Sequence, residues 1–228
     1  MVTILQIETA TQVCSAALAV DGKTIACKEL AAQNIHAANL TLFIREVMET
    51  AGLSYQSLDA IAVSKGPGSY TGLRIGVSTA KGLCFALDRP LIGINTLELM
   101  AGGFLAENPA YTGLVCPMID ARRMEVYTAL YTAALEEIQP VAASIIDASA
   151  YLEVPAEQHI TFIGDGAMKC RETITRANTE FSALNYNSAA HMTLLARQAF
   201  DRQAFEDVAY FEPYYLKDFV ITPAKKKV

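Results

Sequence analysis

The sequence predicts an α/β fold made of two similar lobes, each with the element order βββαβα. Strand-like and helix-like hydrophobic patterns alternate along the 228 residues, and the same order begins again halfway along the chain. The sequence also contains an ungapped repeat, in which Ile7-Glu8 corresponds to Ile119-Asp120. The same shift places Ala17-Leu18 on Ala129-Leu130. We therefore expect two acidic turns, one in each lobe, to face a single cleft between the lobes.

The first lobe is predicted to begin with three antiparallel strands. Ile4–Glu8 and Val13–Val20 are apolar and rich in residues that favour strands, and Asp21-Gly22 is typical of a two-residue hairpin turn. Lys23–Leu30 then supplies the third strand. Apolar residues recur at helical spacing over residues 40–51, and a glycine follows them, which predicts an amphipathic helix that ends there.

The rest of the first lobe is predicted to alternate strand and helix. A Gly-Pro-Gly sequence separates the first of these strands from its helix, and Thr96 is the expected N-cap of the last helix. The predicted elements are a strand at Asp59–Ser64, a helix at Thr71–Leu87, a strand at Leu91–Ile94 and a helix at Thr96–Leu105.

Turn-forming residues around Asn108-Pro109 mark the boundary between the lobes. We expect lobes at residues 1–108 and 109–228, with the last residues able to pack back on the first lobe. The second lobe is predicted to contain strands at Leu114–Ile119, Val126–Tyr131, Val141–Ile146 and Ile160–Ile163, a helix after Gly164 and a helix from about Ser188 to Phe205.

The composition argues against several kinds of function. Only 18% of the residues are charged and the net charge is −6, so contact with RNA is expected to be indirect, and Lys225–Lys227 are interpreted as a solvated terminus. No apolar run approaches the roughly 20 residues of a membrane span, and Met1–Ile7 lacks the features of a signal peptide. The five cysteines are isolated, which suits reduced core thiols in the cytoplasm.

The segment Lys65–Gly72 joins a strand to a helix, where free backbone N–H groups can bind an anion. Its glycine spacing matches neither the dinucleotide fingerprint nor the phosphate loop, so a structural turn is favoured over a nucleotide site. In the helix that follows, Gly72, Gly76 and Ala80 recur every four residues, although each glycine costs about 1 kcal/mol relative to alanine. Two interpretations stay open: this face packs on the chain's own sheet, or it admits a second protein.

The second interpretation makes the two helices of the first lobe part of a subunit interface. It predicts that Gly76→Leu or Arg74→Glu abolishes pairing while the monomer stays folded. The predicted interface residues lie on both helices and on the loop between strand and helix: Phe43, Val47, Gly68, Tyr70, Gly72, Leu73, Arg74, Gly76, Val77 and Ala80.

The two acidic turns define a candidate nucleotide cleft. Paired carboxylates could hold magnesium or orient a water, but neither turn contains the glycine that lets a backbone N–H approach a phosphate. We therefore expect a vestigial cleft, with no catalytic residue and no metal ligand assigned. Its candidate residues are Glu8, Thr9, Asp120, Gly164 and Gly166.

Two hydrolase classes find no support in the sequence. The three histidines lack the H-E-x-x-H spacing of zinc peptidases, and no G-x-S-x-G nucleophile motif occurs. His36 precedes a predicted helix and is interpreted as a cap or surface residue.

Three segments resemble the TsaB family, also called YeaZ: Ile4–Thr11, Val63–Leu83 and Asp120–Tyr127. The resemblance is looser in the second lobe, at Gly164–Gly166 and Pro213–Leu216. It implies an actin-like ATPase (ribonuclease H-like) fold. It also implies a role in forming threonylcarbamoyladenosine next to the anticodon of tRNAs that read codons beginning with A.

The resemblance further implies that a paralogue, TsaD, performs the chemistry. TsaD holds a metal through a histidine pair and accepts threonylcarbamoyl-adenylate, and an ATPase, TsaE, joins the assembly. ATP and metal are thus expected on these partners, and no cofactor on this chain. TsaB-like chains pair with TsaD, or with themselves when TsaD is absent, through the first-lobe helices.

This chain departs from the family pattern at Glu8, where the family usually has Asp, and at Leu40, which replaces the second histidine of the pair that would begin at His36. The sequence therefore predicts a non-catalytic partner subunit. The alternative is a stand-alone actin-like ATPase or phosphotransferase that uses Glu8, Asp120 and Gly164.

Overall fold

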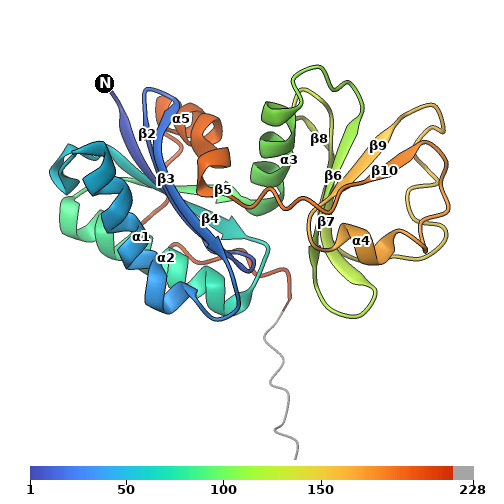
Figure 1. Cartoon of the computed structure of the whole chain (residues 1–228), viewed down its shortest axis with the longest axis horizontal. Helices are drawn as coiled ribbons and strands as arrows, with labels where there is room; N and C mark the ends of the chain where they lie inside the picture. Colours follow the sequence, from blue (N-terminus) through green and yellow to red (C-terminus); the bar gives the residue numbers. More distant parts are fainter. Residues whose placement is uncertain (218–228) are drawn as a thin grey trace, which may run out of the picture.

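The computed structural model describes residues 1–217, which form two lobes side by side (Figure 1). Each lobe contains a five-stranded sheet, and the two strand orders are β3-β2-β1-β4-β5 and β8-β7-β6-β9-β10. In both sheets the first three strands of the lobe are antiparallel and the last two run parallel to the central strand. This duplicated order confirms the predicted α/β fold of two similar lobes.

The first lobe follows the predicted order, and its boundaries lie within about two residues of the predicted ones except at the first helix, which begins four residues before the predicted start at residue 40. Its elements are β1 (Thr3–Glu8), β2 (Val13–Val20), β3 (Lys23–Ala31), α1 (His36–Ala51), a 3₁₀ helix (Tyr55–Ser57), β4 (Ala60–Gly66), α2 (Tyr70–Leu87), β5 (Leu91–Asn95) and α3 (Thr96–Glu107).

Local chemistry explains most of these boundaries. Asp21 and Gly22 both have positive φ, as a tight hairpin between right-twisted strands requires, and Gly52 ends α1 in the left-handed conformation. Ser69 caps α2 by accepting the N–H of Gly72. The expected cap of α3 is wrong by one residue, because the side chain of Asn95 accepts the first amides and Thr96 is already helical.

The second lobe contains β6 (Leu114–Asp120), β7 (Glu125–Tyr131), β8 (Glu137–Ile145), β9 (Ile160–Ile163), α4 (Ala167–Cys170), β10 (Thr179–Phe181), a 3₁₀ helix (Ala189–Met192) and α5 (Thr193–Asp201). Turns over residues 146–159 replace the helix that the first lobe has between its third and fourth strands. Strand β10 was not predicted, because three residues show no periodicity. It is held in place by pairing with β9 and by the stacking of Phe181 on Phe162.

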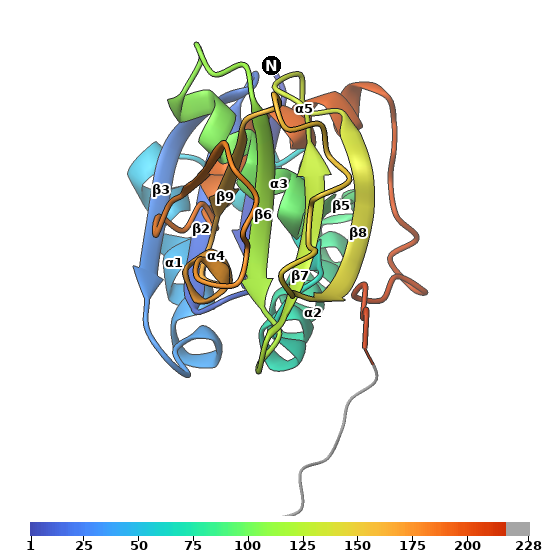
Figure 2. The same cartoon turned by 90° about the vertical axis from the view of Figure 1, so that its right-hand side faces the viewer.

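The elements form layers. Helices α1 and α2 cover the outer face of the first sheet, and α4 with the turns over residues 146–159 covers the outer face of the second. Figure 2 shows α3 behind the second sheet, and the core around it joins residues of both sheets to those of α3 and α5. The ungapped repeat pairs structurally equivalent positions, because Leu18 and Leu130 each belong to the core between the sheet and the outer layer of their lobe.

The chain crosses between the lobes more than once. Helix α3 packs on β6 and β7, whereas α5 returns to β1, β3 and β5 of the first sheet. The segment after α5 continues along the first lobe, where Glu206 bridges to Leu91 and the Lys81 ammonium donates to the carbonyls of Ala209 and Phe211. The boundary near residue 108 stays a prediction.

Four of the cysteines are buried as predicted, but Cys27 is exposed on β3, because the outer strand of the sheet leaves it without cover. No helix within residues 1–217 is both long and apolar enough to cross a membrane. The lysines at 225–227 lie outside the described residues.

Candidate functional site: the cleft between the lobes

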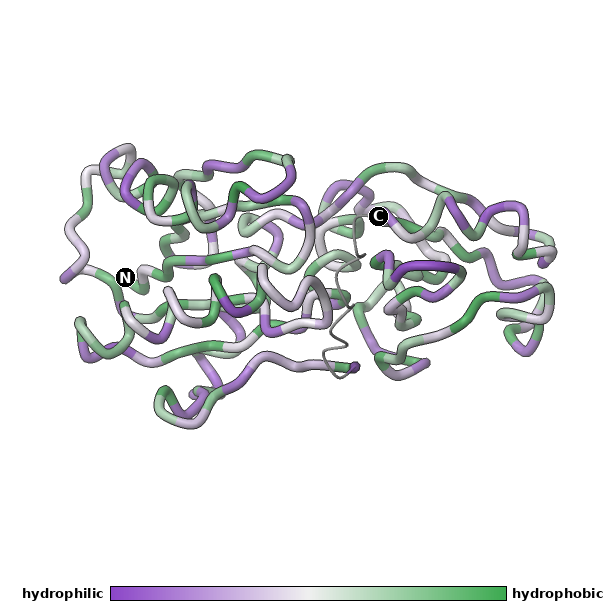
Figure 3. The backbone as a smooth tube through the Cα atoms, turned by 90° about the horizontal axis from the view of Figure 1, so that it is seen from below, coloured by the Kyte–Doolittle hydropathy of each residue, from purple (hydrophilic) through white to green (hydrophobic). Residues whose placement is uncertain are grey.

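A cleft of about 1150 Å³ opens between the two lobes, at the end where β1 and β6 finish. Figure 3 views the molecule from this end. The cleft is lined by the β1–β2 turn, the start of α2, the β6–β7 turn and the C-terminal segment, including Ala10–Gln12, Gly68–Gly72, Ile119–Arg123, Asp165 and Tyr214–Lys217. The predicted cleft between the lobes is therefore present.

The start of α2 is blocked by the chain itself. The N–H of Ser69 donates to the carbonyl oxygen of Ala10 (2.6 Å), and a Cβ at Gly68 would collide with that same oxygen. Likewise a Cβ at Gly72 would collide with the Thr9 carbonyl, and one at Gly76 with the Thr9 hydroxyl. The β1–β2 turn thus packs against the glycine face at the start of α2 and uses one of the N–H groups with which a helix N-terminus would bind a phosphate.

The same contacts decide between the two interpretations of the glycine face. Gly72 and Gly76 are buried against the chain's own turn, so this face packs inside the lobe and does not admit a second protein. For this reason Gly76→Leu is expected to destabilise the monomer itself and not only its pairing.

Other predicted interface residues are also buried in the first lobe. Phe43, Val47, Leu73, Val77 and Ala80 are each no more than 5% exposed and belong to, or pack around, the core under α1 and α2. Arg74 is exposed, with its guanidinium 5.4 Å from the centre of the Tyr70 ring. Tyr70 lines the cleft and contacts Tyr215, with ring centres 4.8 Å apart. Arg74 and Tyr70 are therefore the side chains of the predicted set that a partner could reach, and the interface itself stays a prediction.

Glu8 does not face the cleft. Its side chain is fully buried beneath the β1–β2 turn, where one oxygen accepts the N–H of Ala10 and the other has no partner. Burial raises the pKa of Glu8 to about 7, and the hydrogen bond from the Ala10 N–H opposes this shift only in part. The expectation that two acidic turns face one cleft is therefore wrong for the first lobe, because the carboxyl group serves as an internal anchor of the turn. Thr9 is fully buried as well.

The second-lobe wall carries the acidic residues that do line the cleft. Asp120 forms an ion pair with Lys169, whose ammonium also donates to the carbonyls of Arg123 and Glu125. Asp165 accepts the backbone N–H of Asp120 (2.9 Å), and partial burial raises its pKa. Glu125 is paired with Lys217 of the C-terminal segment. Each acid of this wall thus already has a partner.

Gly164 and Gly166 have a structural role and do not line the cleft. Gly164 has a φ of 95°, and a Cβ there would lie 2.5 Å from the carbonyl oxygen of Met118. The N–H of Gly166 donates to that same carbonyl (2.9 Å). Both glycines therefore let the β9–α4 turn approach β6 closely. Of the five predicted cleft residues, Asp120 is the one that the structure places in the lining.

Sequence reasoning missed the cationic residues of the cleft. Arg122 and Arg123 lie in the β6–β7 turn, both with positive φ (71° and 53°), and both line the cleft and are exposed. The available signal was the Arg-Arg pair in the turn that the repeat aligns with residues 9–12.

The described residues do not fit a metal around His36 or a nucleotide phosphate at the start of α2. His36 is buried rather than capping or on the surface, and its Nε2 lies 3.1 Å from the carbonyl oxygen of Val13. No group of three or more His, Cys, Asp or Glu residues that could hold a metal occurs within residues 1–217. Because the start of α2 is filled by Thr9 and Ala10, no step of chemistry is assigned to such a group here.

A family model for TsaD, tRNA N6-adenosine threonylcarbamoyltransferase, matches residues 29–227 of the chain. The chain belongs to this family. Two TsaB proteins, each named a tRNA threonylcarbamoyladenosine biosynthesis protein, are similar to it. The Escherichia coli (strain K12) protein is 41% identical over 128 residues, which is 56% of this chain and 54% of the relative. The Bacillus subtilis (strain 168) protein is 36% identical over 141 residues, 60% of each chain.

Within the TsaD family, the predicted resemblance to TsaB (YeaZ) is confirmed. The structure of YeaZ from Pseudomonas aeruginosa is 28% identical with a TM-score of 0.84, and the match covers 95% of this chain and all of that one. A second structure from that organism, described as having similarity to peptidase YeaZ, gives a TM-score of 0.86 at the same identity and coverage. The sequence matches are shorter, so the chain spans about half to three fifths of the length of the TsaB relatives it matches.

Proposed function

We propose that this chain is an accessory subunit in the formation of threonylcarbamoyladenosine on tRNA and performs no group transfer of its own. The observation that carries the proposal is the packing at the start of α2, where Ala10 accepts the N–H of Ser69 and Thr9 lies against Gly72, so the chain itself uses an N–H group that a phosphate would need. The names of the TsaB relatives and the likeness to YeaZ over 95% of the chain support the pathway.

The buried turn is poorly suited to phosphoryl or acyl transfer for a second reason. A carboxylate that holds magnesium must be charged and accessible. The pKa of Glu8 is about 7 and its side chain is fully buried, so much of it is protonated near neutral pH, and no ion can reach it without opening the turn. We infer that the chemistry, with its ATP and metal, belongs to partner subunits.

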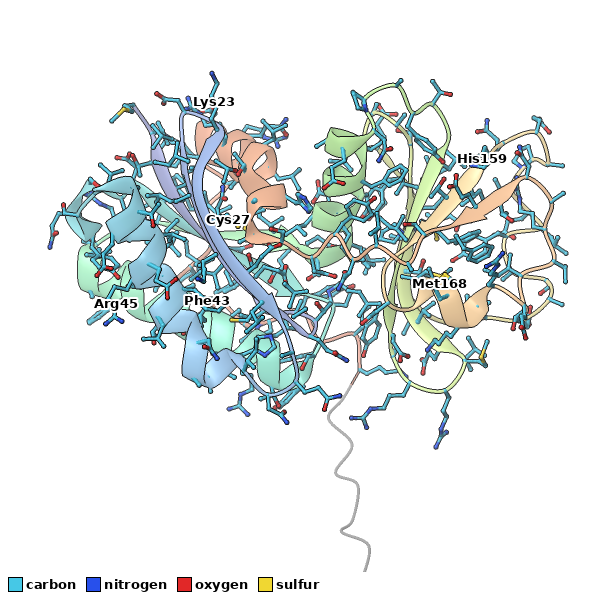
Figure 4. The ribbon with its side chains drawn as sticks, in the orientation of Figure 1. Lys23, Cys27, Phe43, Arg45, His159 and Met168 are labelled. Atoms are coloured by element: carbon cyan, nitrogen blue, oxygen red, sulfur yellow. The ribbon has the colours of Figure 1, made fainter. Side chains whose placement is uncertain are left out.

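We propose that the outer faces of α1 and α2 bind the principal partner, a TsaD-like paralogue, or a second copy of this chain when the paralogue is absent. These faces expose large side chains, among them Phe85 (87% exposed) and Leu42 (40%). Arg45 on α1 points away from the lobe (Figure 4), and Arg74 is exposed on α2. Exposed aromatic side chains and arginines are both enriched at protein interfaces. A TsaE-like ATPase then joins this pair in the cytoplasm.

The first experiment reconstitutes the reaction. The chain, its organism's TsaD-like and TsaE-like proteins, and a source of threonylcarbamoyl-adenylate are mixed with tRNA and labelled threonine. We expect incorporation in the full mixture, and none when this chain is omitted or is used alone. Turnover of ATP by the isolated chain at micromolar affinity would instead establish the alternative of a stand-alone ATPase.

The second experiment tests the binding face. Arg74→Glu combined with Phe85→Ala should weaken co-elution with the TsaD-like protein at least tenfold, because both substituted side chains are exposed and removing them leaves the core intact. Arg171→Glu, an exposed arginine of the second lobe, is the matched control and should co-elute normally. Unchanged co-elution of the double variant would contradict the assignment of this face.

A further inference from the structure

The β6–β7 turn presents two cations to the cleft that nothing in the described chain neutralises. The guanidinium groups of Arg122 and Arg123 have no ion pair and no hydrogen bond to any of residues 1–217. Both residues are exposed and both line the cleft. The left-handed backbone of the turn favours glycine or asparagine, so the geometry of the turn gives no reason for arginine at these positions.

The acids nearby do not supply the missing partner. Asp120 is paired with Lys169, Glu125 is paired with Lys217, and Asp165 accepts a backbone N–H of the same turn. The wall therefore keeps an uncompensated positive charge, although the whole chain has a net charge of −6. Local charge in a cleft, rather than net charge, decides which ligands are attracted there.

Aromatic rings lie at the same opening. Tyr215 is 37% exposed and packs against Tyr70, and Tyr214 is 42% exposed. Tyr127 lines the same cleft from the β7 side. Exposed aromatic rings and unpaired arginines that line one cleft are the combination with which proteins bind single-stranded nucleic acids, because the rings stack on bases and the arginines contact phosphates.

We propose that the opening of this cleft binds a single-stranded segment of RNA, with phosphates on Arg122 and Arg123 and a base against Tyr215. This rests on the proposed function, in which the RNA is the tRNA being modified. It departs from the expectation of indirect contact, which was based on net charge. The phosphates lie at the second-lobe turn and not at the start of α2, which the chain itself fills.

The test measures binding by fluorescence anisotropy, with the isolated full chain and a labelled anticodon stem-loop RNA. Arg122→Glu/Arg123→Glu should weaken binding by about tenfold or more. The association constant K of the variant should also depend less steeply on salt. The negative slope of log K against log salt concentration should become about 1.4 smaller in magnitude, as expected when two phosphate contacts to a single strand are lost. Lys23→Glu/Arg202→Glu is the matched control, with the same change in charge. Lys23 lies at the opposite end of the molecule from this turn (Figure 4), and this control should change affinity less than threefold.

A second pair of variants tests the stacked base. Tyr215→Ala should weaken binding by roughly fivefold or more, whereas Tyr215→Phe should retain it, because the ring and not the hydroxyl supplies the stacking. A fully paired RNA of equal length should bind more weakly than the stem-loop. AMP and inorganic phosphate serve as competitors, and full competition by AMP at the concentration of the stem-loop would assign the site to a free nucleotide and overturn the RNA proposal.

Other outcomes separate this inference from the proposed function. The Arg122→Glu/Arg123→Glu variant should still co-elute with the TsaD-like protein, since its substitutions lie off the α1 and α2 faces. Equal loss of RNA binding in this variant and in the control would overturn the inference, as would binding of the wild-type chain weaker than millimolar. If labelled threonine is no longer incorporated into tRNA when this chain is omitted, the proposed function is still supported, whether or not the chain binds RNA by itself.

Discussion

The turns that end β1 and β6 are equivalent in the repeat but differ in what they contact. Each has four residues after an acidic residue, Thr9–Gln12 after Glu8 and Ala121–Met124 after Asp120. The first turn is packed against α2, which has eighteen residues and carries glycines where the turn touches it. The second turn stands beside α4, which has only four residues, and leaves its arginines exposed. The helix that packs against a turn therefore decides whether the turn becomes core or surface.

The largest expected effect comes from breaking the contact between α2 and the first turn. Gly76→Leu should lower the free energy of unfolding by more than about 3 kcal/mol, because a side chain there must displace Thr9, and urea denaturation measures it. Gly82→Ala on the same helix is the control, since no atom lies within 4 Å of its Cβ position. It should stabilise the chain by up to about 1 kcal/mol. A Gly76→Leu protein with the wild-type midpoint would show that the turn is not packed as described.

A smaller effect is expected from the buried carboxyl group under the first turn. The pKa of Glu8 in the folded state, about 7, lies above its ordinary value of 4.5, so the folded state binds the proton more tightly. Its stabilising contribution is complete below about pH 4.5 and is lost as the pH rises through 7. Glu8→Gln should therefore be more stable than wild type at pH 8, by about 2–3 kcal/mol, and the difference should shrink at pH 5. Parallel stability profiles of the two proteins between pH 5 and 8 would argue against a buried, titrating Glu8.

The second turn has its own anchor, and removing it should cost less. Lys169→Met removes the ammonium that contacts Asp120 and two backbone carbonyls, so we expect a loss of about 1–2 kcal/mol in urea denaturation. Arg171→Met, two residues later and exposed, is the control and should change stability by less than about 0.5 kcal/mol. Equal stability of the two variants would mean that the turn keeps its shape without the lysine.

The smallest effect on stability is expected from the arginines of the second turn. Arg122→Glu/Arg123→Glu should change the free energy of unfolding by less than about 0.5 kcal/mol, because the two exposed guanidinium groups form no ion pair and no hydrogen bond within residues 1–217. Thermal melts of this variant beside Gly76→Leu measure the contrast between the turns directly. A large loss of stability in the arginine variant would mean that the second turn, like the first, is packed into the folded core.

Much of the fold could be predicted from local sequence. The hairpin at Asp21-Gly22, the amphipathic helix ended by Gly52 and the helix after the Gly-Pro-Gly loop are each set by the residues that form them. The repeat of Glu8 at Asp120 also gave the correct equivalence of the two lobes. Strand β10 and the missing helix of the second lobe could not be predicted, since three paired residues and a run of turns have no hydrophobic period.

The candidate site was predicted less well than the fold. The spacing showed that the glycines of α2 form one face of small residues. Such a face is required both for packing against the chain's own turn and for packing against the backbone of a partner, so the sequence could not decide between the two. The acidic residues at the ends of β1 and β6 were alike in sequence, yet Glu8 is buried and Asp120 lines the cleft. Net charge averages over the whole chain, so composition could not show that pairing leaves two arginines of one turn uncompensated.

The sequence by itself determined the α/β class, the duplicated lobes and the resemblance to TsaB, because hydrophobic period, turn residues and motif spacing are local properties of the chain. Only the tertiary structure decided that Thr9 and Ala10 fill the start of α2 and that Arg122 and Arg123 stand free in the cleft. Burial and pairing depend on residues far apart in the chain, such as Asp120 with Lys169, and no local pattern records which of them meet.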